Sequence, residues 1–153
     1  MFSSVKDKNN LLSFNQWSCT EYTNNTSDFV KGGGISFESS NEYSSIGDKS
    51  LKSIRSGDTS NWYGLNYDSS LLSKDIKLSG NVKTEGSSIK INFLESNNGT
   101  TVHTESVNIP ADTTQSFEIT CTTGNENTSF VIQIIVNTAE GIVYLDNLKL
   151  EIQ

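Results

Sequence analysis

Apolar and polar residues alternate along several stretches of the chain. In residues 74–84, 88–95 and 129–137, every second side chain is apolar or small and most of the intervening ones are polar. Successive side chains of a β-strand point to opposite faces, so this alternation predicts strands with one buried face. No window of a dozen residues has the i, i+3, i+4, i+7 spacing of an amphipathic helix. The pattern therefore favours an all-β fold.

Shorter segments with weaker alternation predict further strands. Clusters rich in Gly and Asn, such as Glu85–Ser87 and Asn97–Gly99, separate the alternating runs and predict turns. About eight to ten short strands at regular spacing are typical of a sandwich or a barrel. The weaker candidate strands are residues 11–14, 17–22, 34–39, 50–56, 61–67, 101–109 and 115–122.

Length and composition limit the number of hydrophobic cores. The chain has 153 residues, of which 33% are hydrophobic, and this suits a single domain with one core. We expect a polar N-terminal lead over residues 1–10 and one domain over residues 11–153. Cys19 and Cys121 allow either one disulfide or two buried thiols.

The charge and the hydropathy pattern exclude two classes of partner. The net charge of −7 disfavours nucleic acid, because binding phosphates requires clustered Lys and Arg. No apolar run reaches the roughly 18 residues of a membrane-spanning helix, so we expect no membrane insertion. The first residues contain no apolar segment typical of a signal peptide.

Several motifs follow one another in a familiar order. Residues 47–53, Gly-Asp-Lys-Ser-Leu-Lys-Ser, are followed by Arg55 and by Trp62-Tyr63-Gly64, and residues 143–150 read Val-Tyr-Leu-Asp-Asn-Leu-Lys-Leu. Together with residues 74–83, these motifs resemble the jelly-roll carbohydrate-binding modules of xylanases and related glycanases, within the galactose-binding-like superfamily. The resemblance implies an all-β, two-sheet antiparallel β-sandwich (jelly roll) of about eight to ten strands. It also implies a non-catalytic module that binds a polysaccharide or surface glycan at an extracellular, cell-surface or virion-associated location.

Trp62 is the main candidate for a sugar contact. If Leu65 faces the core, Tyr63 shares that side, and Trp62, Gly64 and Asn66 face outward. An exposed indole is a flat apolar platform on which the C–H face of a pyranose can stack. Gly64 beside it would leave room for the ligand. The alternative interpretation is that Trp62 packs in the core or at a sheet edge.

Three polar residues are candidates to complete the site. Arg55 matches a family position that reaches toward sugar, and its five N–H donors suit pairs of hydroxyls; the alternative is a surface salt bridge. Asn92 and Gln133 alternate with apolar residues, which places them on the outward faces of their strands. There they would complete a polar groove with Asn66.

Asp146 is the candidate metal ligand. In the family that this chain resembles, the matching Asp and backbone carbonyls near the positions of Asp48 and Lys49 hold a structural calcium. Calcium takes about six to eight oxygen ligands. Asp146 is expected to face inward in an apolar strand, where an unpaired carboxylate would be costly. The alternative is a carboxylate bonded to backbone amides. The family usually has an acid after its opening Phe, whereas Phe14 is followed here by Asn15.

The residues predict no catalytic site. His103 is the one histidine, and neither a phosphate loop nor a Gly-x-Ser-x-Gly or HExxH motif occurs. We therefore expect a binding protein and not an enzyme. The alternative function is a structural or adhesion domain of a phage tail or cell-surface protein, without a sugar site and with a homo-oligomer as its assembly.

Overall fold

The computed structural model describes residues 29–31, 33–45, 49–57, 61–67, 73–125 and 129–153. The predicted strands at 11–14 and 17–22, the N-terminal lead and Cys19 lie outside these ranges. Within these ranges, all the regular secondary structure is β-strand. No helix long and apolar enough to cross a membrane is present in this part of the chain.

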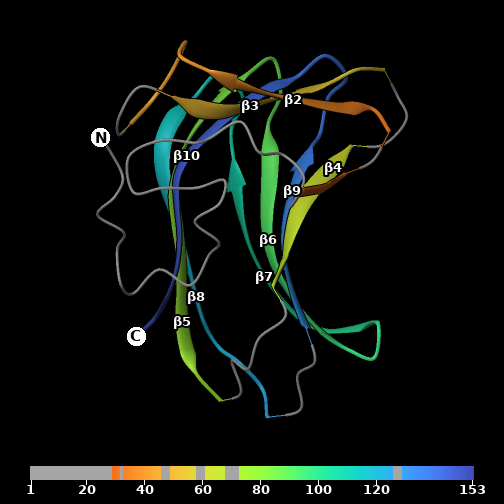
Figure 1. The fold of residues 1–153 in the computed structure, drawn as a ribbon, viewed down its shortest axis with the longest axis vertical. Coiled ribbons are helices and arrows are strands. Elements are labelled where there is room, and N and C mark those ends of the chain that lie inside the picture. The colour runs from red at the N-terminus through yellow and green to blue at the C-terminus, as the bar shows by residue number, and fades with distance from the viewer. Residues whose placement is uncertain (1–28, 32, 46–48, 58–60, 68–72, 126–128) are drawn as a thin grey trace.

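In the described part of the chain, ten strands form two five-stranded antiparallel sheets that face each other (Figure 1). The two-sheet sandwich predicted from the sequence is confirmed. Sheet I has the order β1-β4-β9-β6-β7, with β1 Phe29–Lys31, β4 Trp62–Tyr67, β9 Ser129–Val136, β6 Ile89–Asn97 and β7 Thr100–Ile109. Sheet II has the order β2-β3-β10-β5-β8, with β2 Ile35–Ser40, β3 Ser50–Arg55, β10 Ile142–Ile152, β5 Asp75–Glu85 and β8 Thr114–Thr122.

The core lies between the two sheets and consists of the alternate residues of their strands. Phe37 of β2 meets Tyr63 of β4 across the core, with an edge-to-face contact of 5.0 Å between ring centroids. Burial raises the pKa of the Tyr63 hydroxyl. The fully buried apolar side chains include Leu51, Ile76, Leu78, Val82, Ile89, Ile91, Phe93, Phe130, Ile132, Val136, Val143, Leu145 and Leu150.

A β-bulge in β10 changes which side of sheet II the closing motif presents. Asp146 pairs with Asn81 of β5, but the next paired residue of β10 is Lys149, opposite Ser79. The extra residue lets both Leu145 and Leu148 stay buried, while Asp146 shares the outer side with Asn81. The expectation that Asp146 faces the core is therefore wrong, because the strand does not keep a strict period of two through the bulge.

Candidate functional site

Trp62 lies on the outer side of sheet I. It pairs with Ile135 of β9, which pairs in turn with Lys90 of β6. Because the next residue, Tyr63, is fully buried in the core, alternation directs the Trp62 indole away from the core. The indole is partly exposed. We call the outer surface formed by Trp62, Ile135, Lys90, Gln133 and Asn92 the Trp62 face.

A pair of amides occupies the row next to Trp62. Gln133 of β9 lies between Gly64 and Asn92 in the strand register, so it is a diagonal neighbour of Trp62 at about 7–8 Å. The Asn92 Nδ2–H donates a hydrogen bond of 3.0 Å to Gln133 Oε1. The structure thus brings together three of the residues that the sequence singled out.

The Asn92 amide is not fully satisfied by this bond. Its side chain is only 5% exposed, and its Oδ1 has no hydrogen-bond partner among the described residues. A buried acceptor without a donor costs about 1–3 kcal/mol. The middle of the Trp62 face therefore carries an acceptor that a ligand hydroxyl could satisfy, once the amide turns toward it.

Gly64 allows close packing of β4 against β9, a role that the pattern of a single strand does not show. A Cβ at this position would collide with the carbonyl oxygen of Ile132 on β9. The missing side chain lets the backbones of β4 and β9 approach each other. The sheet itself therefore requires a glycine at this position, and the room that Gly64 would leave for a ligand stays a prediction. Asn66 follows on the same strand, opposite Val131, and its side chain lies outside what the structure describes.

Arg55 does not lie on the Trp62 face. It is the last residue of β3, in sheet II, and only 9% of it is exposed. Its Nη1–H donates to the carbonyl oxygen of Val136 on β9, at 3.0 Å, so the side chain links the two sheets at one end of the sandwich. No ion pair to Arg55 is present in the described part of the chain. The alternative interpretation of Arg55 as a partner in a surface salt bridge is therefore not met either.

Asp146 is buried on the outer side of sheet II and is hydrogen-bonded to Ser45. Its Oδ2 accepts hydrogen bonds from the Ser45 N–H, at 2.7 Å, and from the Ser45 hydroxyl, at 2.9 Å, and the residue is 1% exposed. The Ser45 N–H matches the alternative interpretation of a carboxylate bonded to backbone amides, and the Ser45 hydroxyl adds a second donor. A calcium ion at this position would have to share the carboxylate with Ser45.

The other predicted calcium ligands add little to this carboxylate. Lys49 is exposed, and Asp48 lies outside the described residues. Among the residues that the structure describes, no group of three or more His, Cys, Asp or Glu side chains could hold a metal. A calcium site at Asp146 therefore stays a prediction.

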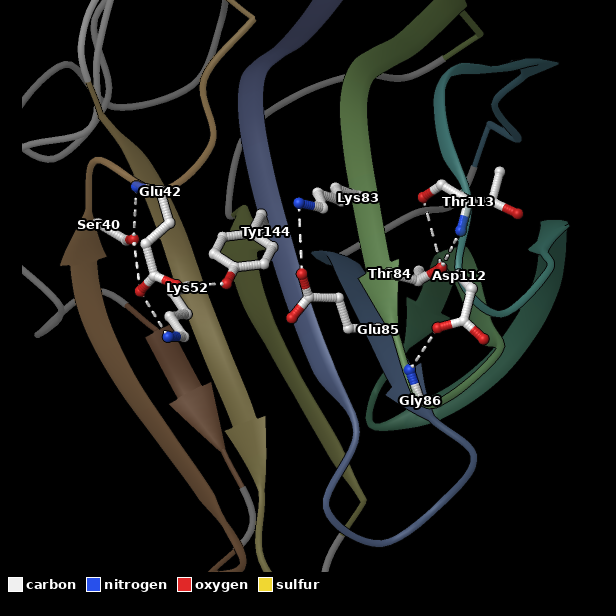
Figure 2. Close-up of polar contacts among 10 residues, drawn as sticks. All are labelled: Ser40, Glu42, Lys52, Lys83, Thr84, Glu85, Gly86, Asp112, Thr113 and Tyr144. Atoms are coloured by element: carbon white, nitrogen blue, oxygen red, sulfur yellow. Dashed lines mark hydrogen bonds and ion pairs between the residues drawn. The ribbon is translucent and has the colours of Figure 1, made fainter.

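A polar cluster of Glu42, Lys52, Lys83 and Tyr144, the Glu42 cluster, holds the residues that follow β2 against β10 (Figure 2). The Tyr144 hydroxyl donates to Glu42 Oε2 at 3.0 Å, and Lys52 Nζ lies 2.7 Å from Glu42 Oε1. The ammonium groups of Lys52 and Lys83 lie 5.5 and 5.4 Å from the centroid of the Tyr144 ring. The hydrogen bond from Lys52 lowers the pKa of Glu42. Alternation with Val143 and Leu145 could have predicted an outward Tyr144 from the sequence.

His103 lies next to a carboxylate, and Cys121 has a thiol with a raised pKa. His103 Nε2 lies 2.8 Å from Glu105 Oε2, and both side chains are partly exposed on edge strand β7. Burial, followed by the nearby carboxylates of Glu105 and Glu95, raises the pKa of the Cys121 thiol to about 11. A thiol with this pKa is protonated at neutral pH and is a poor nucleophile.

The chain was compared with known proteins by sequence and by structure. No family model matches the sequence, and no curated protein matches it significantly. Solved structures do match in fold. An enzymatically active domain of tailspike protein 4 from bacteriophage CBA120 superposes with a TM-score of 0.73 at 11% identity, covering 85% of this chain and 20% of that one.

Carbohydrate-binding modules are prominent among the similar structures. The CBM22-1 xylan-binding domain of Paenibacillus barcinonensis Xyn10C has a TM-score of 0.64 and 16% identity, and the match covers 85% of this chain and 88% of that module. A CBM61 module in complex with β-1,4-galactotriose has a TM-score of 0.62 and 14% identity, over 85% and 92% of the two chains. At these identities the similarity establishes the fold. The chain has the jelly-roll β-sandwich of carbohydrate-binding modules, as its motifs indicated.

Proposed function

We propose that this domain binds a polysaccharide or surface glycan through the Trp62 face and has no catalytic activity. The proposal depends mainly on one observation, the partly exposed, outward-directed indole of Trp62 beside the Asn92–Gln133 amide pair. An indole contributes apolar contact area for the C–H face of a sugar ring. Neighbouring amides supply both donors and acceptors for its hydroxyls.

The properties of the similar structures support a carbohydrate ligand. The Paenibacillus module is described as xylan-binding, and the CBM61 structure contains β-1,4-galactotriose. Both modules are matched over nearly their whole length, so the comparison concerns complete binding modules. Together with the tailspike match, they support an extracellular, cell-surface or virion-associated location for this domain.

Affinity gel electrophoresis in xylan, β-glucan, mannan and pectin, with and without calcium, tests the proposal. We expect at least one polysaccharide to retard the wild-type protein. Gln133→Ala should weaken that retardation by about tenfold in affinity, since one ligand hydrogen bond and the Asn92 contact are lost. Unchanged mobility of the wild-type protein in all four polymers would contradict the proposal.

A second candidate function is that of a structural or adhesion domain in a phage tail or on a cell surface. The observation that favours it is the TM-score of 0.73 with the tailspike domain, the highest of the three comparisons described above. Such a domain is expected to assemble with copies of itself. Size-exclusion chromatography with light scattering tests this candidate: a stable homo-oligomer supports it, and a monomer contradicts it.

A further inference from the structure

A hollow lies on the outer side of sheet II, the sheet that does not carry the Trp62 face. It has a volume of about 340 Å³, at the lower end of the roughly 300–1,000 Å³ typical of small-molecule sites. It lies where the bulge of β10 interrupts the pairing with β5. The residues that line it come from β5, β8 and β10: Lys77, Ser79, Gly80, Asn81, Ser116, Phe117, Glu118 and Asn147.

Asn147, the extra residue of the bulge, has an unsatisfied side chain. Its backbone is in the left-handed region, with φ of 53°, a conformation that Asn tolerates better than most residues. Its Oδ1 is buried and has no hydrogen-bond partner among the described residues. The Cβ–Cγ torsion of Asn is broad, so the amide can turn to meet a donor in the hollow.

The other polar groups of the hollow are also available to a ligand. No hydrogen bond from the side chains of Ser79, Asn81, Ser116 or Glu118 to another described residue is present. Lys77 has a loose ion pair with Glu151, at 3.9 Å. Gly80 and Phe117 complete the lining. Phe117 belongs to the core and is only 6% exposed, so the hollow offers little apolar surface.

The mixture of groups indicates the class of ligand. Glu118 disfavours an anion, and Lys77 disfavours a metal cation. Hydroxyls, amides and one group of each charge suit a neutral molecule with many hydroxyls and a small apolar surface. We propose that this hollow is a second saccharide-binding site, which would let the domain bind sugars on both outer faces of the sandwich. Sugar binding in the hollow does not depend on the Trp62 face; only its description as the second site rests on the proposed function.

Titration of the ¹⁵N-labelled protein with xylose, galactose and glucose, one at a time, tests the second site by NMR. We expect saturable shifts of the Asn81 side-chain amide and the Gly80 backbone amide with at least one sugar. The titration should extend to roughly 50 mM, well above the millimolar Kd of a weak site. If neither of these two amides shows a saturable shift with any of the three sugars, the proposal is overturned.

Three variants test whether the shifts come from sugar bound in this hollow. Asn147→Gly keeps the left-handed backbone, removes the amide and should lower the affinity by about tenfold. Asn98→Gly is the matched control, since Asn98 also has a positive φ, of 50°, but lies outside the hollow, and it should leave the shifts unchanged. Trp62→Ala should also leave them unchanged, whether or not the Trp62 face binds glycan. Shifts that persist at full affinity in Asn147→Gly, or that disappear in Trp62→Ala, would overturn the proposal.

Discussion

Single residues in this domain take roles that depend on their immediate contacts. Gly64 lies in a strand that the sequence predicts, yet the collision that a Cβ would make with the Ile132 carbonyl appears only once β4 and β9 are paired. Arg55 was predicted to face a ligand, but it ends β3 between the sheets and bonds to Val136. The pattern of one strand cannot predict these contacts, because they come from residues of another.

Gly64→Ala should destabilise the domain by about 1–3 kcal/mol, because the methyl group forces β4 and β9 apart. Chemical denaturation followed by tryptophan fluorescence measures the change in the free energy of unfolding. Gly33→Ala is the control, since nothing lies within 4 Å of a Cβ at Gly33. Equal stability of the two variants would contradict the close approach at Gly64.

Cys121 should react slowly with iodoacetamide in the folded protein. Its thiol has a pKa raised to about 11, so little thiolate is present at pH 8. We expect alkylation in a Cys19→Ser background to be at least about tenfold slower than in the same protein unfolded in urea, and to accelerate as the pH approaches 11. Folded and unfolded proteins that react at the same rate at pH 8 would show that this thiol is not shielded.

At the scale of elements, the strands with strong alternation were predicted closely. The runs at 74–84, 88–95 and 129–137 correspond to β5, β6 and β9 with shifts of at most two residues at their ends. The three-residue strand β1 is too short to show alternation and was not predicted. The side of Asp146 was predicted wrongly, because the bulge of β10 arises from pairing with β5. Among the candidate site residues, Trp62, Asn92 and Gln133 were correctly placed on outward faces, since each lies in a regular part of its strand.

The Glu42 cluster should make the stability of the domain depend on pH in the acid range. Lys52 and Tyr144 lower the pKa of Glu42 from 4.5, so its contribution is present above that value and is lost as the pH falls through the lowered pKa. We expect the melting temperature of Glu42→Gln to fall less than that of the wild type between pH 5 and pH 3.

Glu38→Gln is the control for this cluster, since the Glu38 carboxylate is 3.9 Å from Lys52, compared with 2.7 Å for Glu42. This variant should keep the wild-type dependence on pH. If Glu42→Gln and the wild type lose the same amount of stability on acidification, the cluster does not hold residues 40–45 in the way described.

At the scale of the whole molecule, the calcium prediction concerns the stability of the fold. If Asp146 holds calcium in addition to its bonds with Ser45, a chelator should lower the melting temperature, because an ion bound only to the folded state stabilises it. Asp146→Asn should abolish that response. A wild-type melting temperature that does not change on addition of chelator would contradict the calcium prediction and leave Ser45 as the partner of this carboxylate.

The outer surfaces of the two sheets differ in chemical character. The outer side of sheet I carries an indole next to two amides, whereas the outer side of sheet II carries the Glu42 cluster and the hollow at Asn147. The fold alone does not distinguish a glycan-binding module from an assembly domain, since it occurs in both carbohydrate-binding modules and a tailspike domain. Glycan binding at the Trp62 face would make that distinction.

The most direct test compares the affinity-gel mobility of the wild type, Trp62→Ala and Val102→Ala in the same series of polysaccharides. Val102 is a matched control because it is an apolar residue of sheet I that is 59% exposed and lies outside the Trp62 face. We predict that at least one polysaccharide retards the wild type and Val102→Ala equally, while Trp62→Ala migrates freely and keeps the wild-type melting temperature. If the polysaccharides retard all three proteins equally, or retard none of them, glycan binding through Trp62 is contradicted.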